Sequence, residues 1–335
     1  MTILLTGGSG FIGTNFINNW MRNEEEHIVN LDMLTYAANR HETEQRDKCE
    51  RYTFIETNIA NTQKVSQILS KYKPRAVINF AAETHVDASI STPDKFIKKN
   101  ILSSYEFLKT VTGYWNHSTP IEQQKFVFMQ VSTDEVYGSL ETWEPPFSET
   151  SNIKPNSPYS ASKASFDHIL SAWHSTYGLP VVISRCSNNF GPFQNREKFI
   201  PKIIYNSVNE KKIPIYGDGS QIRDWLFVED HCNALCCLLE NGKPGEIYNV
   251  GGNQELQNID LVNLICDYLD RVMPSKKIVS YRDLIEFVSD RPGHDLRYAI
   301  DNTKISGLGW SSKRPFKKSL EKTIEWYLKN NLINC

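Results

Sequence analysis

A tyrosine and a lysine four residues apart are the first candidates for chemistry in this sequence. Tyr159 and Lys163 lie in the segment SPYSASKAS. Pro158 and Ser160 predict the start of a helix there, so the tyrosine and the lysine share one helix face. A lysine beside a phenol favours the phenolate and lowers the pKa of the tyrosine. The pair therefore predicts a general base that works near neutral pH.

Two adjacent carboxyl groups form a second candidate site. Asp134 and Glu135 lie in STDEVYG at 132–138, directly after an apolar run at 125–131 that predicts a strand. Parallel sheets bind ligands beyond the carboxyl ends of their strands. An isolated Asp-Glu pair is usually a pair of solvated turn acids, but this position favours paired acid and base groups in a substrate site.

A glycine-rich string follows the first apolar run. The segment GGSGFIG at 7–13 stands between a predicted strand and a predicted helix, where glycines allow a tight turn and the helix N-terminus attracts a pyrophosphate. The next predicted strand ends in Asp32, about 20 residues further on, where a carboxylate accepts hydrogen bonds from a ribose diol. The following residues MLTY contain no arginine for a 2′-phosphate, so the sequence favours NAD over NADP.

These residues must be positioned by the elements around them. Short apolar runs alternate with amphipathic helical patterns through the first half of the chain, which predicts a parallel sheet covered by helices on both faces. The expected strands are 2–5, 27–31, 52–56, 76–80, 125–131 and 181–185, and the expected helices are 11–22, 64–71, 100–112 and 160–177. The predicted fold class is α/β, a Rossmann-type doubly wound parallel sheet.

The pattern changes after about residue 185. Pieces rich in proline and glycine follow, with helices expected near 199–209, 229–240 and 259–272. We expect an NAD-binding domain at 1–185 and a smaller mixed α/β substrate-binding lobe at 186–335, partly interleaved with the first. No flexible linker separates the two, so they are expected to share a cleft.

Composition excludes several classes of protein. The chain has 335 residues and a formal net charge of -2, which argues against a nucleic-acid partner. No apolar stretch reaches the roughly 20 residues that span a bilayer, and the opening MTILLTGG does not resemble a signal peptide. The seven cysteines form no CxxC pair, so neither a metal site nor a disulfide framework is expected. A cytoplasmic location is the resulting expectation.

Eight segments along nearly the whole chain resemble one family. The sequence resembles the extended short-chain dehydrogenases/reductases, and within them the nucleoside-diphosphate-glucose 4,6-dehydratases of the dTDP-glucose type. The segments are GGSGFIG, AAETHVDASI, STDEVYG, SPYSASKAS, NNFGPF, PIYGDGSQIRDWLFVEDH, YNVGGNQE and DRPGHDLRYAID. The first belongs to the whole superfamily, whereas STDEVYG, SPYSASKAS, PIYGDGSQIRDWLFVEDH and DRPGHDLRYAID are specific to these dehydratases.

The resemblance implies a reaction and a role for five residues. Tyr159, aided by Lys163, takes the proton of the sugar 4-hydroxyl while NAD oxidises C4, and Thr133 holds that hydroxyl. Glu135 then removes the C5 proton, and a protonated Asp134 delivers a proton to the departing C6 hydroxyl. Hydride returns to C6, so the cofactor ends as it began. The implied product is dTDP-4-dehydro-6-deoxy-glucose plus water.

The resemblance also implies two sets of contacts. Those to NAD, with the glycines included, are Gly7, Gly10, Phe11, Ile12, Gly13, Asp32, Met33, Leu34, Thr35, Asn58, Ile59, Phe80, Ala81, Ala82, Glu83, Thr84, Tyr159, Lys163 and Asn189. Those to the nucleotide sugar are Thr84, Thr133, Asn188, Lys198, Phe199, Pro214, Ile215, Tyr216, Arg223, Asn258, Asp290, Arg291, Pro292, Gly293 and His294. Lys99 stands where the family has a small hydroxyl residue.

Some of these residues allow simpler interpretations. Arg223 and Arg291 suit a pyrophosphate because a guanidinium binds oxyanions with two parallel hydrogen bonds, but either could be a surface ion-pair residue. Asn258 precedes a helical pattern and could equally be an N-cap. His85 and His294 could be structural hydrogen-bonding residues.

Other functions remain open at this stage. UDP-glucose or CDP-glucose could replace dTDP-glucose as the substrate. A nucleotide-sugar 4-epimerase would not need Asp134 and Glu135, and a glucuronate decarboxylase has no C6 hydroxyl for Asp134 to protonate. A dinucleotide-sensing or scaffold protein would be expected to lack one of the five catalytic side chains. The resemblance implies a homodimer in which 100–112 and 160–177 pair across a two-fold axis. The segment 100–112 carries Ile101, Leu102, Tyr105 and Leu108 at helical spacing, and these apolar residues could equally face the core.

Overall fold

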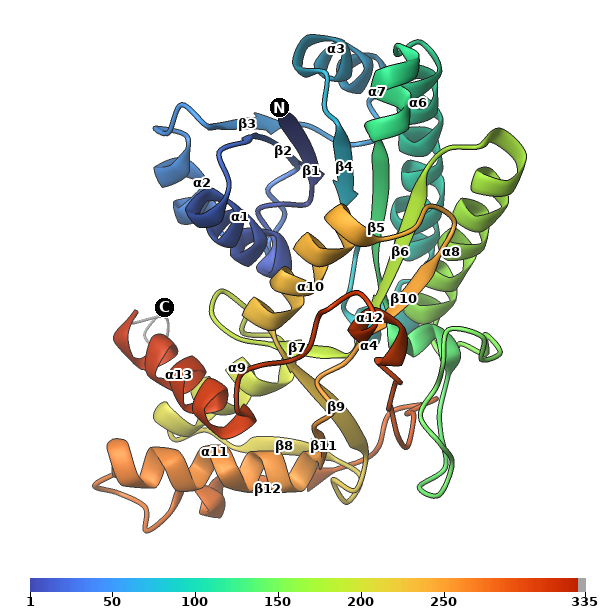
Figure 1. Cartoon of the computed structure of the whole chain (residues 1–335). Helices are drawn as coiled ribbons and strands as arrows, with labels where there is room; N and C mark the ends of the chain where they lie inside the picture. Colours follow the sequence, from blue (N-terminus) through green and yellow to red (C-terminus); the bar gives the residue numbers. More distant parts are fainter. Residues whose placement is uncertain (331–335) are drawn as a thin grey trace.

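A seven-stranded parallel sheet organises the larger part of the molecule. The computed structural model describes residues 1–330, and Figure 1 shows its two lobes. The strand order β10-β6-β5-β4-β1-β2-β3 is that of a doubly wound sheet. Its strands are β1 (Thr2–Thr6), β2 (His27–Asp32), β3 (Tyr52–Glu56), β4 (Ala76–Asn79), β5 (Val127–Thr133), β6 (Val181–Cys186) and β10 (Ile247–Val250). The predicted fold class is confirmed.

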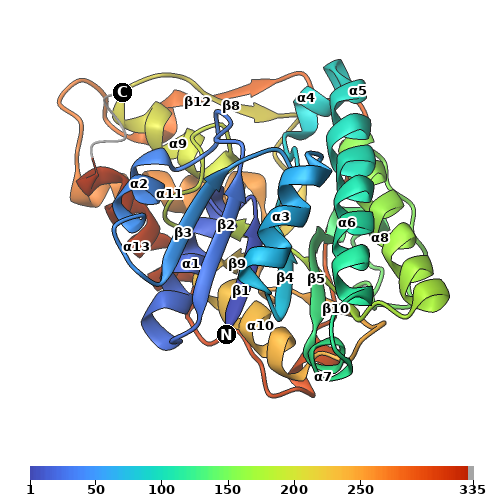
Figure 2. The same cartoon turned by 90° about the horizontal axis from the view of Figure 1, so that it is seen from above.

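Helices cover both faces of this sheet because successive side chains of a buried strand point to opposite sides. Ile3 and Leu5 of β1 pack with Phe16 and Trp20 in one core, and Leu4 packs with the other. The first face is covered by α1 (Phe11–Asn23) and α10 (Val228–Asn241), and the second by α3 (Thr62–Tyr72), α6 (Ser104–Asn116) and α8 (Pro158–Tyr177). Figure 2 shows α6 beside α8 from above.

A smaller lobe lies beyond the carboxyl edge of the sheet (Figure 1). It contains a three-stranded sheet ordered β11-β9-β7, a parallel pair β12-β8, and an apolar core of its own formed mainly by three helices and β8 and β9. The elements are β7 (Asn188–Phe190), β8 (Ile213–Tyr216), β9 (Ile222–Phe227), β11 (Glu255–Gln257), β12 (Ile285–Val288), α9 (Phe199–Val208), α11 (Asn258–Val272) and α13 (Phe316–Lys329).

Shorter helical segments connect these layers. They are α2 (Arg40–Arg46), α4 (Val86–Ser91), α5 (Pro93–Phe96), the π-helical turn η1 (Ile97–Ser103), α7 (Pro120–Lys125), the 3₁₀ turns η2 (Asp134–Tyr137) and η3 (Tyr281–Leu284), and α12 (Thr303–Ser306). Within residues 1–330, no helix combines the length and the apolar character needed to cross a bilayer.

The structure differs from the sequence-based expectations at three places. Lys125 ends α7 instead of opening a strand, because a capping box between Thr119 and Glu122 starts a helix there. Asn258 is the first residue of α11 rather than its N-cap, since Gln257 occupies that position. The central sheet also takes β10 from the chain after residue 186. The domain boundary at residue 185 stays a prediction.

Candidate active site

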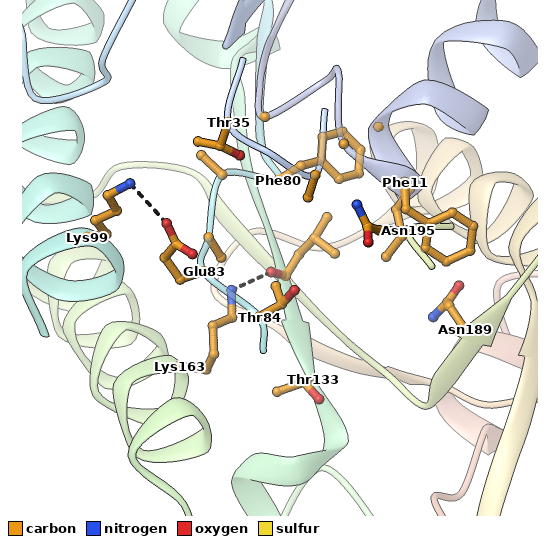
Figure 3. A pocket seen from close by; sticks show the side chains of 18 of the residues that line it. Phe11, Thr35, Phe80, Glu83, Thr84, Lys99, Thr133, Lys163, Asn189 and Asn195 are labelled. Atoms are coloured by element: carbon orange, nitrogen blue, oxygen red, sulfur yellow. Dashed lines mark hydrogen bonds and ion pairs between the residues drawn. The ribbon is translucent and has the colours of Figure 1, made fainter. Parts of the chain in front are cut away.

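A cavity of about 340 Å³ opens at the carboxyl edge of the central sheet. This is the edge at which doubly wound sheets bind their ligands, and the volume is in the usual range for ligand pockets. All of the residues predicted to contact NAD line it except Leu34, and all five predicted catalytic residues line it as well. The predicted catalytic residues and nearly all of the predicted NAD contacts thus share one pocket, part of which Figure 3 shows.

The glycine string makes a turn that larger residues could not make. Gly7 has a φ of +69°, and a Cβ atom at this position would lie 2.7 Å from the backbone nitrogen of Ala81. A Cβ at Gly13 would lie 2.5 Å from the Cα of Gly8. These glycines are therefore required by the close packing of the turn itself. Gly7, Gly10 and Gly13 also line the cavity, and a helix N-terminus there suits a dinucleotide pyrophosphate.

Asp32 ends β2 at the rim of this loop. Its carboxylate accepts hydrogen bonds from the backbone N–H groups of Ser9 (3.0 Å) and Leu34 (2.8 Å), which fix it against the glycine turn. Burial raises the pKa of Asp32, and these backbone hydrogen bonds oppose that shift. An acceptor held at this place suits a ribose diol, so the residues present fit NAD.

The five predicted catalytic residues come from three neighbouring elements, β5, η2 and α8. Thr133 is the last residue of β5, and Asp134 and Glu135 form the first turn of η2. Tyr159 and Lys163 lie in the first turns of α8, where Ser157 and Ser160 form a capping box that fixes the helix start. Packing of α8 against β5 therefore brings both sequence motifs to the same cavity.

The two carboxyl groups occupy different environments. Burial raises the pKa of Asp134 well above its ordinary value, and the charges of Glu135 and Asp224 raise it further. Burial also raises the pKa of Glu135, but the guanidinium groups of Arg291 and Arg223 oppose that shift. The rise is the larger for Asp134, so these surroundings favour Asp134 over Glu135 as the carboxyl group that keeps a proton.

The surroundings of Tyr159 correct one expectation. Burial raises the pKa of Tyr159 well above its ordinary value and the charge of Glu135 adds to this, while a hydrogen bond with Thr133 opposes it. The expected lowering by Lys163 is wrong for this structure. The Lys163 ammonium donates to the carbonyl oxygen of Val131 at 2.8 Å (Figure 3), and burial lowers its own pKa. Lys163 thus lies buried in the site without setting the pKa of the phenol.

The predicted substrate contacts fall into two groups. Thr84, Thr133, Asn188 and Lys198 line the cavity, and the Lys198 ammonium donates to the carbonyl oxygen of Thr84 at 2.7 Å. The others lie outside the lining of that cavity, and they are Phe199, Pro214, Ile215, Tyr216, Arg223, Asn258, Asp290, Arg291, Pro292, Gly293 and His294.

Contacts within the second group nevertheless join its separate segments. The Asp290 carboxylate accepts from Gln221 Nε2 at 3.1 Å and pairs with the His294 ring at 2.6 Å. The Asn258 amide lies 3.5 Å from the side-chain oxygen of Gln221. The start of α11, the turn before β9 and the 290–294 loop thus form one polar surface in the smaller lobe.

Of the two arginines, only Arg223 departs from an ordinary surface ion-pair residue. Arg223 is buried, donates to the backbone oxygens of Ile222 and Asp295, and stacks on the ring of Tyr298 at 4.3 Å. Arg291 forms an ion pair with Asp87 at 3.2 Å. The charges of both arginines oppose the rise that burial causes in the pKa of Glu135.

Lys99, a departure from the family pattern, lines the cavity and forms an ion pair with Glu83 at 2.9 Å (Figure 3). Asn195 and Asn189 lie across the pocket from this pair in the same view.

Thirteen residues that line the cavity were not predicted from the sequence. One of them is Lys99, which was noted only as a departure from the family pattern. The others are Leu31, Ala37, Ala38, Thr57, Ser103, Val131, Ser132, Cys186, Ser187, Gln194, Asn195 and Glu197. The strand-end rule could have found Val131, Ser132, Cys186 and Ser187, because they lie at the carboxyl ends of β5 and β6.

Comparison with known proteins agrees with the geometry. Residues 4–323 match the family model described as GDP-mannose 4,6 dehydratase. The dTDP-glucose 4,6-dehydratase 1 of Escherichia coli K12 is 47% identical over 98% of this chain and 93% of its own length. The dTDP-glucose 4,6-dehydratase of Haemophilus influenzae is 47% identical over 99% of both chains.

Solved structures give the same answer. A dTDP-glucose 4,6-dehydratase from Streptomyces venezuelae, crystallised with NAD and TYD, superposes with a TM-score of 0.89 at 36% identity and covers 99% of this chain and 98% of its own. The Bacillus anthracis dTDP-glucose 4,6-dehydratase in complex with NAD has a TM-score of 0.85 at 39% identity, covering 99% and 97%. The chain belongs to the dTDP-glucose 4,6-dehydratase family.

Proposed function

We propose that this protein converts dTDP-glucose to dTDP-4-dehydro-6-deoxy-glucose and water with tightly bound NAD. The observation that carries the proposal is the pair Asp134 and Glu135, whose different surroundings favour one acid and one base in the pocket that holds Tyr159. The similar enzymes named above act on dTDP-glucose, and two of the similar structures contain NAD. Because the product is a 4-keto-6-deoxy sugar nucleotide, the enzyme catalyses a step of deoxysugar biosynthesis.

The chain supplies the binding site for the cofactor. The glycine turn at 7–13 would receive the pyrophosphate, and the Asp32 carboxylate would accept hydrogen bonds from a ribose diol. Phe80 to Thr84, Tyr159, Lys163 and Asn189 line the rest of the cavity. When bound, NAD accepts hydride from C4 of the sugar and returns it to C6.

The side chains of the pocket move the protons. Thr133 holds the sugar 4-hydroxyl and Tyr159 takes its proton as C4 becomes a ketone. The ketone acidifies the proton on C5, which Glu135 removes. Asp134 gives its proton to the C6 hydroxyl, so the C6–O bond breaks and water leaves. Hydride at C6 and a proton at C5 complete the product. The proton taken by Tyr159 must then return to Asp134, so that the net change is the loss of one water.

Asp134 distinguishes this function from two others on the same scaffold. A 4-epimerase moves hydride at C4 only, and it has no leaving group that needs a proton. A glucuronate decarboxylase likewise has no C6 hydroxyl to expel. A buried carboxyl group whose pKa lies well above its ordinary value is an acid ready to protonate a leaving hydroxyl.

The deciding experiment uses the purified protein without added cofactor. dTDP-glucose, UDP-glucose and CDP-glucose are incubated separately and the products are followed by mass spectrometry. We expect dTDP-glucose to lose one water with no net change in reduced NAD, and the other two sugars to react more slowly. Formation of the 4-epimer without loss of water would contradict the dehydratase. Faster dehydration of UDP-glucose would contradict the choice of nucleotide.

We also propose that the protein is a homodimer joined through η1, α6 and α8. Leu102 is 55% exposed on η1, and Tyr105 packs edge-on against Trp173 of α8 at 5.7 Å. Leu108 lies in the core, so only part of the predicted apolar face is available to a partner.

A cytoplasmic location is supported by free thiols at Cys49, Cys186, Cys232, Cys236, Cys237 and Cys266. The seventh cysteine, Cys335, lies outside the described residues.

Replacing Leu102 with aspartate is expected to separate such a dimer, because a charge at the centre of an apolar interface must lose its water. Sedimentation velocity should show the monomer for this variant and the dimer for the unchanged protein. Ile121→Asp is the matched control, since Ile121 is 68% exposed on the separate helix α7. The same sedimentation coefficient for all three proteins would rule out this interface.

A further inference from the structure

Asp87 connects the two lobes beside the candidate active site. It lies in the first turn of α4, which follows β4 of the central sheet. One carboxylate oxygen accepts from Arg291 Nη1 at 3.2 Å, and the other accepts from the Tyr216 hydroxyl at 3.3 Å. Tyr216 ends β8, and Arg291 lies in the loop after β12. A single carboxylate of the larger lobe thus contacts two segments of the smaller lobe that are far apart in the sequence.

Both partners of Asp87 are among the predicted substrate contacts. Burial raises the pKa of Glu135, and the charge of Arg291 opposes that rise. The Nε atom of Arg291 is buried and has no hydrogen-bond partner among residues 1–330. The guanidinium therefore has an N–H group that is not used by Asp87. The Tyr216 ring packs edge-on against the His294 ring at 6.1 Å. Asp87 therefore contacts both Arg291, a cation suited to a pyrophosphate, and Tyr216, an aromatic residue among the predicted substrate contacts.

Asp87 itself is held in place from the larger lobe. The His85 ring caps α4 by accepting from the backbone N–H of Ala88 at 3.3 Å, and the Ser89 hydroxyl donates to the carbonyl oxygen of Val86 at 2.6 Å. The Asp87 side chain is 41% exposed, and an ion pair at such a position adds little to folding stability. Loss of the carboxylate should therefore act on the orientation of Arg291 and Tyr216 more than on the fold.

We propose that Asp87 is a positioning residue for the substrate, which fixes Arg291 and Tyr216 so that they bind the nucleotide part of the sugar nucleotide. This inference rests on the proposed function. Within residues 1–330, the hydrogen bonds and ion pair of the Asp87 carboxylate reach Tyr216 and Arg291 and neither Tyr159 nor a residue predicted to bind NAD. Its role therefore separates substrate affinity from the chemical step.

The test compares Asp87→Asn with the unchanged protein. With dTDP-glucose we expect KM to rise about tenfold, the size expected for losing hydrogen bonds from a charged group, while kcat changes by less than about twofold. Calorimetric titration with dTDP should show the same loss of affinity, and the amount of NAD that copurifies should not change. Asp87→Glu, which keeps the charge, is expected to recover part of the affinity.

Two further variants distinguish positioning from a general effect. Asp94→Asn removes an exposed carboxylate from the adjacent α5 and should leave KM unchanged. Tyr216→Phe in the Asp87→Asn background should cost less than it does alone, because the two groups act together. An unchanged or lowered KM for Asp87→Asn would overturn the inference. Failure of the unchanged protein to dehydrate dTDP-glucose would instead overturn the proposed function, and dTDP binding would still report on Asp87.

Discussion

Tyr159→Phe is expected to lower kcat for dTDP-glucose by about 10³-fold, within the range for losing a general acid or base. The phenol is the base that takes the proton of the sugar 4-hydroxyl in the proposed reaction, and every later step needs the C4 ketone. Burial and the charge of Glu135 raise the pKa of Tyr159, so the phenol must first lose its own proton before it can act as this base. Steady-state turnover measured by mass spectrometry checks the result.

The matched control for this variant is Tyr72→Phe. Tyr72 ends α3, outside the candidate pocket, and removal of its hydroxyl should leave kcat unchanged. The amount of bound NAD should be equal in all three proteins, because the substitution at position 159 keeps the aromatic ring that lines the cavity. Retention of more than about a tenth of the activity in Tyr159→Phe would show that another group takes the first proton.

Asp134→Asn is expected to lower kcat by about 10²- to 10⁴-fold through loss of the proton for the departing C6 hydroxyl. Oxidation at C4 precedes that step, so mixing this variant with dTDP-glucose should raise the near-ultraviolet absorbance of reduced NAD without release of product. Glu135→Gln should give the same absorbance rise because removal of the C5 proton fails. Stopped-flow absorbance together with product analysis separates the two half-reactions.

The two variants differ in the charge that they leave behind. Asp134→Asn keeps a neutral group where burial already favours a neutral one, so its fold should be as stable as that of the unchanged protein. Glu135→Gln removes a negative charge that interacts with the positive charges of Arg291 and Arg223. Those two charges are then less well balanced in the folded protein. Full turnover by either variant, with no delay in product release, would remove the corresponding acid or base from the mechanism.

The structure explains why a small number of local patterns was enough to locate the pocket. The glycine string, STDEVYG and SPYSASKAS each follow a strand or begin a helix, and these boundaries depend on apolar periodicity and on capping residues nearby in the chain. In a parallel sheet the strand ends meet at one edge, so Gly7, Asp32 and Thr133 lie together although far apart in sequence.

Local patterns gave less reliable results where packing determines the outcome. The predicted effect of Lys163 on Tyr159 assumed that two side chains on one helix face interact, whereas the lysine instead bonds to Val131 of the adjacent strand. The apolar stripe at 100–112 contains both Leu108, which is buried, and Leu102, which is exposed. Helical spacing gives the same pattern for both, and only the position of the neighbouring elements separates core from surface.

The order of apolar and helical patterns along the chain was enough to predict the fold class, and short motifs were enough to predict the family, the dinucleotide turn and the five catalytic candidates. The partners of these groups could not be predicted in that way, because they come from distant parts of the chain. Asn189 is held by the buried ring of His231 at 2.9 Å, and Asp87 meets Arg291 more than 200 positions further along the chain. Burial, and the charges that folding brings together, set the pKa shifts of Asp134, Glu135 and Tyr159. Those shifts depend on distances in space, which spacing in the chain does not fix.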